Sequence, residues 1–142
     1  MSSNPPRSVM PIITVDSVDA EHDFYTEKLG FTRLMGVVGK DGRFDFVTVV
    51  LGEARIMFAR PKDERESTGP APGKRAVEIY LEVADVEAYL RELTARGVRI
   101  SEPLTMQWWG DQTFKIIDPY GYQVWFYQSV AEPRPPQGVK LV

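Results

Sequence analysis

The chain has 142 residues, of which 43% are hydrophobic and 26% are charged, and its formal net charge at pH 7 is −3. These values are typical of a globular protein with one core, and the acidic balance disfavours nucleic acid or an anionic membrane as a partner. The chain has no cysteine, which excludes disulfides, thiolate catalysis and cysteine-ligated zinc. It has no apolar run long enough to cross a membrane, and its first residues lack the apolar core of a signal peptide, so we expect a cytoplasmic protein.

The first half of the chain predicts a strand, a helix and three further strands. An apolar run at 9–15 is typical of a strand. A helix is expected over 16–30, with Gly30 at its end. Its N-cap is either Asp16 or Ser17. Three strands separated by glycine-containing turns are then expected at 31–39, 44–52 and 54–60.

The second half predicts the same order of elements. An alternating run at 77–83 is typical of a strand. A helix is expected over 85–97, with Asp85 as its N-cap and Gly97 at its end. Three strands are then expected at 98–104, 113–118 and 122–128.

A shift of 68 residues aligns the two halves. It places Val15 on Val83, and the helix ends at Gly30 and Gly97 differ by 67, so one helix is a residue longer. Alternating strands can match by coincidence, but here the turns, the helix caps and the strand alternation all agree. We interpret the pattern as the duplication of one βαβββ unit, because a solenoid would need three or more copies.

We predict a single domain of the α+β class over residues 1–142. Its two modules are expected at about 9–60 and about 76–129. The connector between them, 61–75, mixes charged residues with glycine and proline and is expected to be exposed. The remaining segments are two loose tails that contain prolines, at 1–8 and 130–142.

Three stretches carry a resemblance to a known family: FYTEKLGF at 24–31, EIYLEVADVEAYLRELTARGV at 78–98 and DPYGYQVWFYQ at 118–128. They resemble the vicinal oxygen chelate superfamily of glyoxalase, bleomycin-resistance and extradiol dioxygenase proteins. The pair Trp109 and Gly110 is most similar to the bleomycin-resistance-like branch. The resemblance implies two tandem βαβββ modules whose mixed sheets curl into a cup with the helices outside. It also implies a homodimer with ligand sites in the cups.

The resemblance further implies up to four metal ligands, two in each module, which are typically His or Glu. Counted from the second helix cap and from the DP-x-G turn, two positions fall on Glu78 and Trp125, and the repeat adds Met10 and Met57. One carboxylate, two thioethers and an indole lack the oxygen and nitrogen donors that Mg²⁺, Mn²⁺, Fe²⁺ or Zn²⁺ require. We therefore predict neither a metal nor another cofactor. The only histidine, His22, is expected to be partly buried in the first helix.

Strand alternation separates the residues of the cup from those of the core. Ile79, Leu81, Val124 and Phe126 are expected to pack under the helices. The opposite face would line the cup with Met10, Arg55, Met57, Glu78, Tyr80, Glu82, Gln123, Trp125 and Tyr127. An apolar and aromatic lining with a few polar groups suits a small apolar or aromatic ligand.

Trp108 and Trp109 lie in a polar connection before a strand. Two adjacent aromatic residues in such a loop cannot both be buried in one direction. Two roles stay open for them: anchoring the core or a dimer partner, and stacking on a planar ligand.

Glu78 has three candidate roles: a salt bridge with Arg55, a contact to a ligand, and a general base that Trp125 and Met57 shield from water. We therefore favour a metal-independent binding protein that sequesters its ligand. The alternative is a metal-free isomerase, lyase or cyclase that uses Glu78. A metal-dependent lyase or dioxygenase and an interaction module without a ligand are less favoured, and whether the protein is an enzyme stays open.

Overall fold

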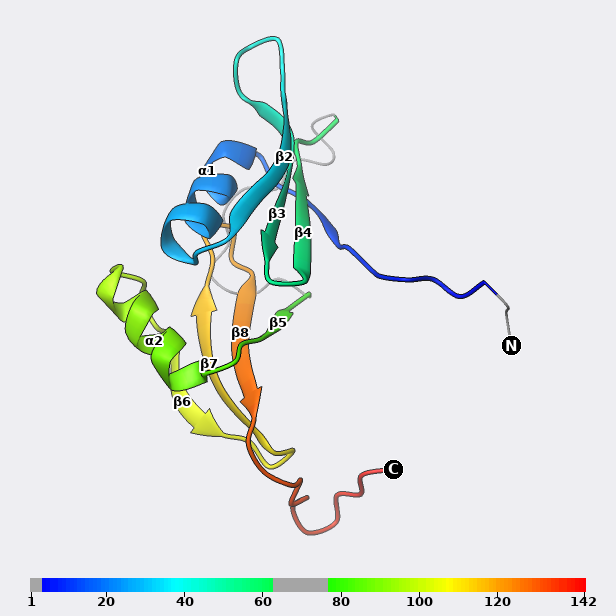
Figure 1. Cartoon of the computed structure of the whole chain (residues 1–142), viewed down its shortest axis with the longest axis vertical. Coiled ribbons are helices and arrows are strands. Elements are labelled where there is room, and N and C mark those ends of the chain that lie inside the picture. Colours follow the sequence, from blue (N-terminus) through cyan, green and yellow to red (C-terminus); the bar gives the residue numbers. More distant parts are fainter. Residues whose placement is uncertain (1–3, 63–76) are drawn as a thin grey trace. The chain divides into compact units, whose positions relative to one another are not determined.

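The computed structural model describes residues 4–62 and 77–142 and divides the chain into two compact units, Met1–Gly69 and Pro70–Val142 (Figure 1). From residue 63 on, the expected connector lies outside the described residues. Each unit contains a mixed four-stranded sheet with helix packed against it. The α+β class and the two tandem βαβββ modules are thereby confirmed, whereas the cup that the two sheets would form together stays a prediction.

In the first unit the strand order of the sheet is β1-β4-β3-β2. β1 runs parallel to β4, and the other neighbours are antiparallel. A helix that starts as α1 and continues as the π-helical turn η1 connects β1 to β2. The elements are β1 (Ile12–Thr14), α1 (Val18–Asp23), η1 (Phe24–Lys28), β2 (Thr32–Val38), β3 (Phe44–Leu51) and β4 (Ala54–Ala59).

The second unit has the same topology, with the strand order β5-β8-β7-β6 and a parallel pair of β5 and β8. Its single helix α2 has no π-helical turn. The elements are β5 (Ile79–Glu82), α2 (Val86–Ala95), β6 (Glu102–Met106), β7 (Asp111–Ile117) and β8 (Gln123–Ser129).

The strand register repeats as the sequence predicts. Ile12 pairs with Met57 in the first unit, and 68 residues later Tyr80 pairs with Trp125 in the second. β4 and β8 also pair with the antiparallel strands β3 and β7. There Thr48 lies opposite Met57 and Lys115 lies opposite Trp125, so β3 and β7 are related by a shift of 67. Counted between register-equivalent pairs, the β7–β8 hairpin therefore contains one residue more than the β3–β4 hairpin.

The extra residue of the first helix is accommodated by the π-helical turn. The Leu29 amide donates to the Phe24 carbonyl at 3.2 Å, which spans five residues instead of four. A π-helical turn is the usual way in which a helix absorbs a single additional residue. The unequal positions of Gly30 and Gly97 thus have a local cause.

Both helices begin and end as the cap residues indicate. The Ser17 hydroxyl accepts a hydrogen bond from the Ala20 amide at 3.1 Å, which decides between the two expected N-caps. The Asp85 carboxylate accepts from the Ala88 amide at 3.0 Å. Gly30 and Gly97 have φ angles of 83° and 78°, the left-handed conformation that favours glycine after a helix.

Two strands begin three or four residues later than the prediction. The run at 9–15 forms a strand only over Ile12–Thr14, because Pro11 has no amide hydrogen and joins the sheet only through its carbonyl, which accepts from Met57. The strand expected at 98–104 is instead Glu102–Met106, because the Val98 amide is used to close the end of α2 on Leu93.

Burial agrees with the expected alternation in both sheets. Ile79 and Leu81 are at most 8% exposed, and Val124 and Phe126 are fully buried on the helix side. The ring centroids of Tyr89 and Phe126 are 4.9 Å apart, and those of Tyr25 and Phe58 in the first unit are also 4.9 Å apart. The opposite faces carry the accessible side chains, of which Ile12 is 62% exposed and Tyr80 is 41% exposed.

Candidate functional site

Four aromatic side chains gather on the face of the second sheet that α2 leaves uncovered. We refer to Tyr80, Trp109, Trp125 and Tyr127 as the aromatic face. Tyr80 stacks on Tyr127 with 4.3 Å between ring centroids, and it lies 5.5 Å from Trp125. Trp109 lies 6.5 Å from Trp125. The parallel pairing of β5 and β8 places Tyr80 directly opposite Trp125, so strand register alone creates most of this cluster.

A hydrogen-bonded network fixes the orientation of these rings. The Tyr80 hydroxyl donates to Asp111 Oδ2 at 2.6 Å and accepts from Trp109 Nε1 at 2.9 Å. The second oxygen of Asp111 accepts from the Ser129 hydroxyl at 2.7 Å. Asp111 is buried, and two successive hydrogen bonds connect its carboxylate to the side chains of Tyr80 and then Trp109, while the third connects it to Ser129. Rings that are held in this way lose little further freedom when a ligand stacks on them.

This network also keeps the phenols protonated. Burial, and then the hydrogen bond to the Asp111 carboxylate, raise the pKa of Tyr80 to about 12. Burial and the neighbouring carboxylates of Glu82 and Asp111 raise the pKa of Tyr127. Both phenols therefore lose their protons at a higher pH than an ordinary tyrosine does.

Trp125 lies between a carboxylate and an ammonium group. Its indole N–H donates to Glu78 Oε1 at 2.8 Å. Lys115 Nζ lies 4.0 Å from the ring centroid, at cation–π distance. The same ammonium group pairs with Glu102 at 2.8 Å and contacts the Gln123 amide oxygen at 3.4 Å. Trp125 is therefore held at its N–H edge and on a ring face.

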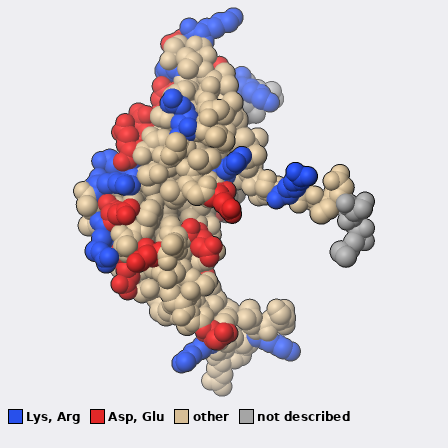
Figure 2. Space-filling model, viewed as in Figure 1, with Lys and Arg blue, Asp and Glu red and all other residues tan. Residues whose placement is uncertain are grey.

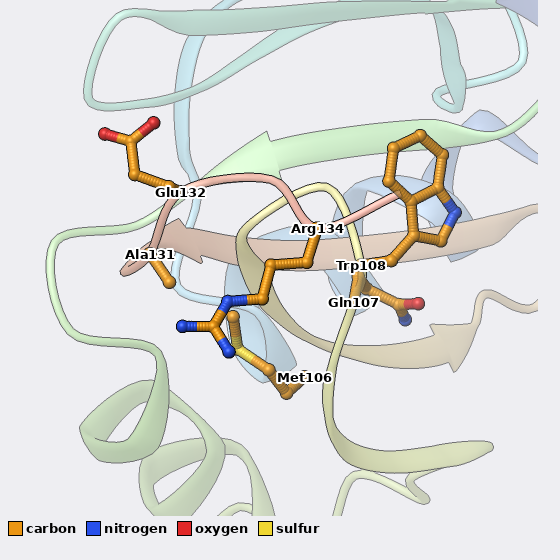
Figure 3. Close-up of a pocket in the computed structure, with 6 residues that line it drawn as sticks. All are labelled: Met106, Gln107, Trp108, Ala131, Glu132 and Arg134. Carbon is orange, nitrogen blue, oxygen red and sulfur yellow. The ribbon is translucent and has the colours of Figure 1, made fainter. Parts of the chain in front are cut away.

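The predicted site residues fall into three groups. The second sheet brings seven of them together: Glu78, Tyr80, Glu82, Trp109, Gln123, Trp125 and Tyr127. In the first unit Met10 and Arg55 line a cavity of about 620 Å³, and Met57 lies opposite Ile12 on the first sheet. Trp108 turns to a different cavity, of about 490 Å³, beside the loop that joins β6 to β7 (Figure 3).

The sequence interpretation missed Asp111 and Ser129. It began the seventh strand at residue 113, whereas β7 begins at Asp111. Two more residues of strand place Asp111 on the same face as Thr113 and Lys115, which is the aromatic face. The alternation within DQTFKII was the signal that could have identified Asp111, but the neighbouring tryptophans made this stretch resemble a loop.

The side chains at the four ancestral ligand positions do not fit a metal ion. Glu78 is the only carboxylate among them, and one of its oxygens already accepts the indole N–H of Trp125. Within residues 4–62 and 77–142, no three His, Cys, Asp or Glu side chains form a group that could hold a metal. His22 is half-buried in the first helix, where it contacts Asp23 at 2.9 Å and the ring of Phe44.

The surface charge and the helix lengths give two further observations. On the face shown in Figure 2, basic and acidic side chains are interspersed. In the described part of the chain, none of the helices has the length and apolar character needed to span a bilayer.

The fold is that of a protein built from two βαβββ modules. Residues 8–126 match the Glyoxalase/Bleomycin resistance protein/Dioxygenase superfamily, and the chain belongs to this family. No curated protein matches the sequence.

Solved structures with the same fold include a bleomycin-binding protein from bleomycin-producing Streptomyces verticillus in complex with copper(II)-bleomycin. It is 24% identical, covers 91% of this chain and 99% of its own, and has a TM-score of 0.64. TioX from Micromonospora sp. ML1 is 22% identical over 87% of this chain and 99% of its own, with a TM-score of 0.69. A glyoxalase/bleomycin resistance protein/dioxygenase from Nocardioides is 19% identical over 96% and 91%, with a TM-score of 0.71.

Proposed function

We propose that this protein binds a small aromatic or apolar molecule on the aromatic face and sequesters it without a metal ion. The observation that carries the proposal is the network of Tyr80, Trp109 and Asp111, which holds two rings in place before any ligand arrives. Each stacked ring pair contributes about 0.5–1.5 kcal/mol beyond the burial of apolar area. A planar ligand that contacts two or three of these rings would therefore reach a useful affinity by stacking alone.

The comparison with bleomycin-binding proteins supports a binding function, because sequestration needs shape and stacking but no catalytic group. The donor set at the four ancestral positions supports metal independence, since it contains one carboxylate and that carboxylate is engaged by Trp125. The side chains of this face determine which ligand binds, and such side chains vary among proteins that share one fold.

The binding proposal is tested with anthracenemethanol, a neutral planar probe, by following tryptophan fluorescence with and without a chelator. We expect saturable quenching that the chelator leaves unchanged. Trp125→Ala should weaken the affinity about tenfold or more, which corresponds to roughly 1.4 kcal/mol. Stoichiometric Fe, Mn, Ni or Zn in the purified protein, together with loss of binding on chelation, would contradict metal independence.

A second candidate function is a metal-free isomerase, lyase or cyclase in which Glu78 acts as the general base. Glu78 Oε1 accepts from Trp125, but Oε2 has no hydrogen-bond partner among the described residues, so this oxygen is available to take up a proton. Glu78 is exposed, so a substrate on the aromatic face could reach it.

Glu78→Gln separates the two functions. The amide oxygen of glutamine still accepts the indole N–H, which keeps Trp125 in place, but the side chain no longer accepts a proton. If the protein only binds, the affinity for the neutral probe should change less than threefold. If it is an enzyme of this type, turnover of its substrate should fall by about 10²-fold or more, the usual contribution of a general base.

We also propose that the protein forms a homodimer in the cytoplasm. β2 is an edge strand of the first sheet, and its side chains are exposed along the whole strand. Four of them are large and apolar: Leu34, Met35, Val37 and Val38. An edge strand with this composition tends to pair with another chain. Sedimentation should report twice the monomer mass, and Leu34→Lys with Val37→Lys should shift the protein to monomer.

A further inference from the structure

A second cavity lies beside the loop that joins β6 to β7. It has a volume of about 490 Å³, within the range of small-molecule sites. All of its lining residues belong to the second unit: Met106, Gln107, Trp108, Ala131, Glu132 and Arg134 (Figure 3). None of them is part of the aromatic face. The rings of Trp108 and Trp109 are perpendicular, and Trp109 is hydrogen-bonded to Tyr80, so the two tryptophans serve different sites.

One wall of this cavity is the start of the C-terminal tail, which is attached to the loop by its backbone. The amides of Val130 and Ala131 donate to the Gly110 carbonyl at 2.9 and 3.1 Å. Gly110 has a φ of 100°, and a Cβ atom there would overlap the Ala131 carbonyl oxygen. Glycine is thus required at this position, both for its conformation and for the close approach of the tail.

The attachment of the tail places an arginine beside a tryptophan. The Arg134 amide donates to the Trp108 carbonyl at 2.6 Å, so the backbones of these two residues are bonded directly. Their side chains both line the cavity, and Met106, which is 51% exposed, adds apolar surface.

Arg134 is the cation of this cavity. Its guanidinium forms no ion pair within the described part of the chain. Figure 3 shows the guanidinium and the Glu132 carboxylate directed away from each other. The side-chain amide of Gln107 is already committed, because it donates to the Thr113 hydroxyl at 2.9 Å. A ligand would therefore meet one available guanidinium and one indole.

We propose that this cavity is a second binding site, which takes a small aromatic carboxylate. The guanidinium of Arg134 forms paired hydrogen bonds to the carboxylate, a geometry for which its planar fork is suited. Trp108 and Met106 contact the aromatic ring. The charge of the ligand distinguishes this site from the aromatic face, where the carboxylates of Glu78, Glu82 and Asp111 outnumber the ammonium group of Lys115 and disfavour an anion.

The test uses naphthoate and its neutral isostere naphthamide, observed through the ¹⁵N-labelled indole signals of the three tryptophans. Each signal is assigned with a single Trp→Phe variant. We expect naphthoate to shift the Trp108 signal in a saturable manner and to bind about tenfold more tightly than naphthamide. Arg134→Met should weaken naphthoate about tenfold and leave naphthamide within twofold, and Arg134→Lys should recover only part of the loss.

Arg91→Met is the matched control, because Arg91 is an exposed arginine of α2 in the same unit. It should leave both probes unchanged. Equal affinity of naphthoate for the unmodified protein and for Arg134→Met would overturn the proposal. So would a naphthoate-induced shift at Trp125 with none at Trp108. Anthracenemethanol binding to the aromatic face is measured separately, so the failure of one site does not affect the result for the other.

Discussion

The two units share a backbone register but present different side chains on the face that no helix covers. In the first unit this face is aliphatic and sulfur-containing, and in the second it is aromatic and charged. The register-equivalent pairs are Ile12 with Tyr80, Thr14 with Glu82, Met57 with Trp125 and Ala59 with Tyr127. The helix-facing residues are similar by contrast, as Phe58 and Phe126 show. Packing under the helix thus maintains the fold, while the side chains of the opposite face are free to differ between the two units.

The largest expected effect concerns what the two units share. Phe58→Ala and Phe126→Ala each remove a fully buried ring from equivalent positions, and each should lower the free energy of unfolding by about 3–5 kcal/mol. Urea unfolding followed by circular dichroism measures both losses. Similar losses would support the interpretation that the two cores are equivalent. A loss below about 1 kcal/mol at either position would contradict it.

The next effect concerns what distinguishes the units. Trp125→Met gives the second sheet the residue of the first, and it should weaken anthracenemethanol about tenfold because a stacking ring and its hydrogen bond to Glu78 are lost. The reciprocal Met57→Trp is the control and should not weaken binding. Fluorescence titration measures both affinities. If Trp125→Met binds the probe as well as the unmodified protein does, the predicted contribution of Trp125 is contradicted.

A smaller effect concerns the buried carboxylate of the aromatic face. Asp111→Asn removes the charge that helps to raise the pKa of Tyr80 to about 12, so this pKa should fall. The absorbance of phenolate during an alkaline titration measures the change. Tyr89 is an internal control, because burial in the helix layer raises its pKa to about 12 without Asp111. An unchanged titration curve would show that Asp111 does not influence Tyr80.

The smallest effect is a pH dependence of stability. Tyr80 has a pKa of about 12 in the folded protein, whereas in the unfolded chain it loses its proton near the ordinary tyrosine pKa of 10. The contribution is complete below pH 10 and is lost as the pH rises towards 12. Tyr80→Phe should make the decline in melting temperature over this range shallower, and an identical decline would contradict this linkage.

Much of the fold could be read from local signals. Ser17, Asp85, Gly30 and Gly97 mark the helix ends, and alternation assigns Ile79 and Tyr80 to opposite faces. These features depend on neighbours within a few residues, where sequence patterns are informative. The same rules failed where a nearby element competed for the backbone, as at Val98, whose amide closes a helix instead of joining a strand.

The candidate site was less accessible to sequence reasoning. Asp111 is 18 residues from Ser129 and 31 from Tyr80, and it bonds to both only because β5, β8 and β7 are consecutive strands of one sheet. The rings of Trp108 and Trp109 are perpendicular to each other, and no spacing rule predicts how two adjacent residues in a loop are oriented. No sequence pattern indicated Arg134 as a site residue, because a backbone hydrogen bond to Trp108 determines its position.

By itself, the sequence determined the repeated βαβββ plan and the family, because these depend on residue type and on periodicity along the chain. Only the tertiary structure decided which aromatic rings meet, which carboxylate holds them and where the tail forms a second cavity. The physical reason is that hydrogen bonds and ring contacts act over a few ångströms in space, whatever their separation in sequence.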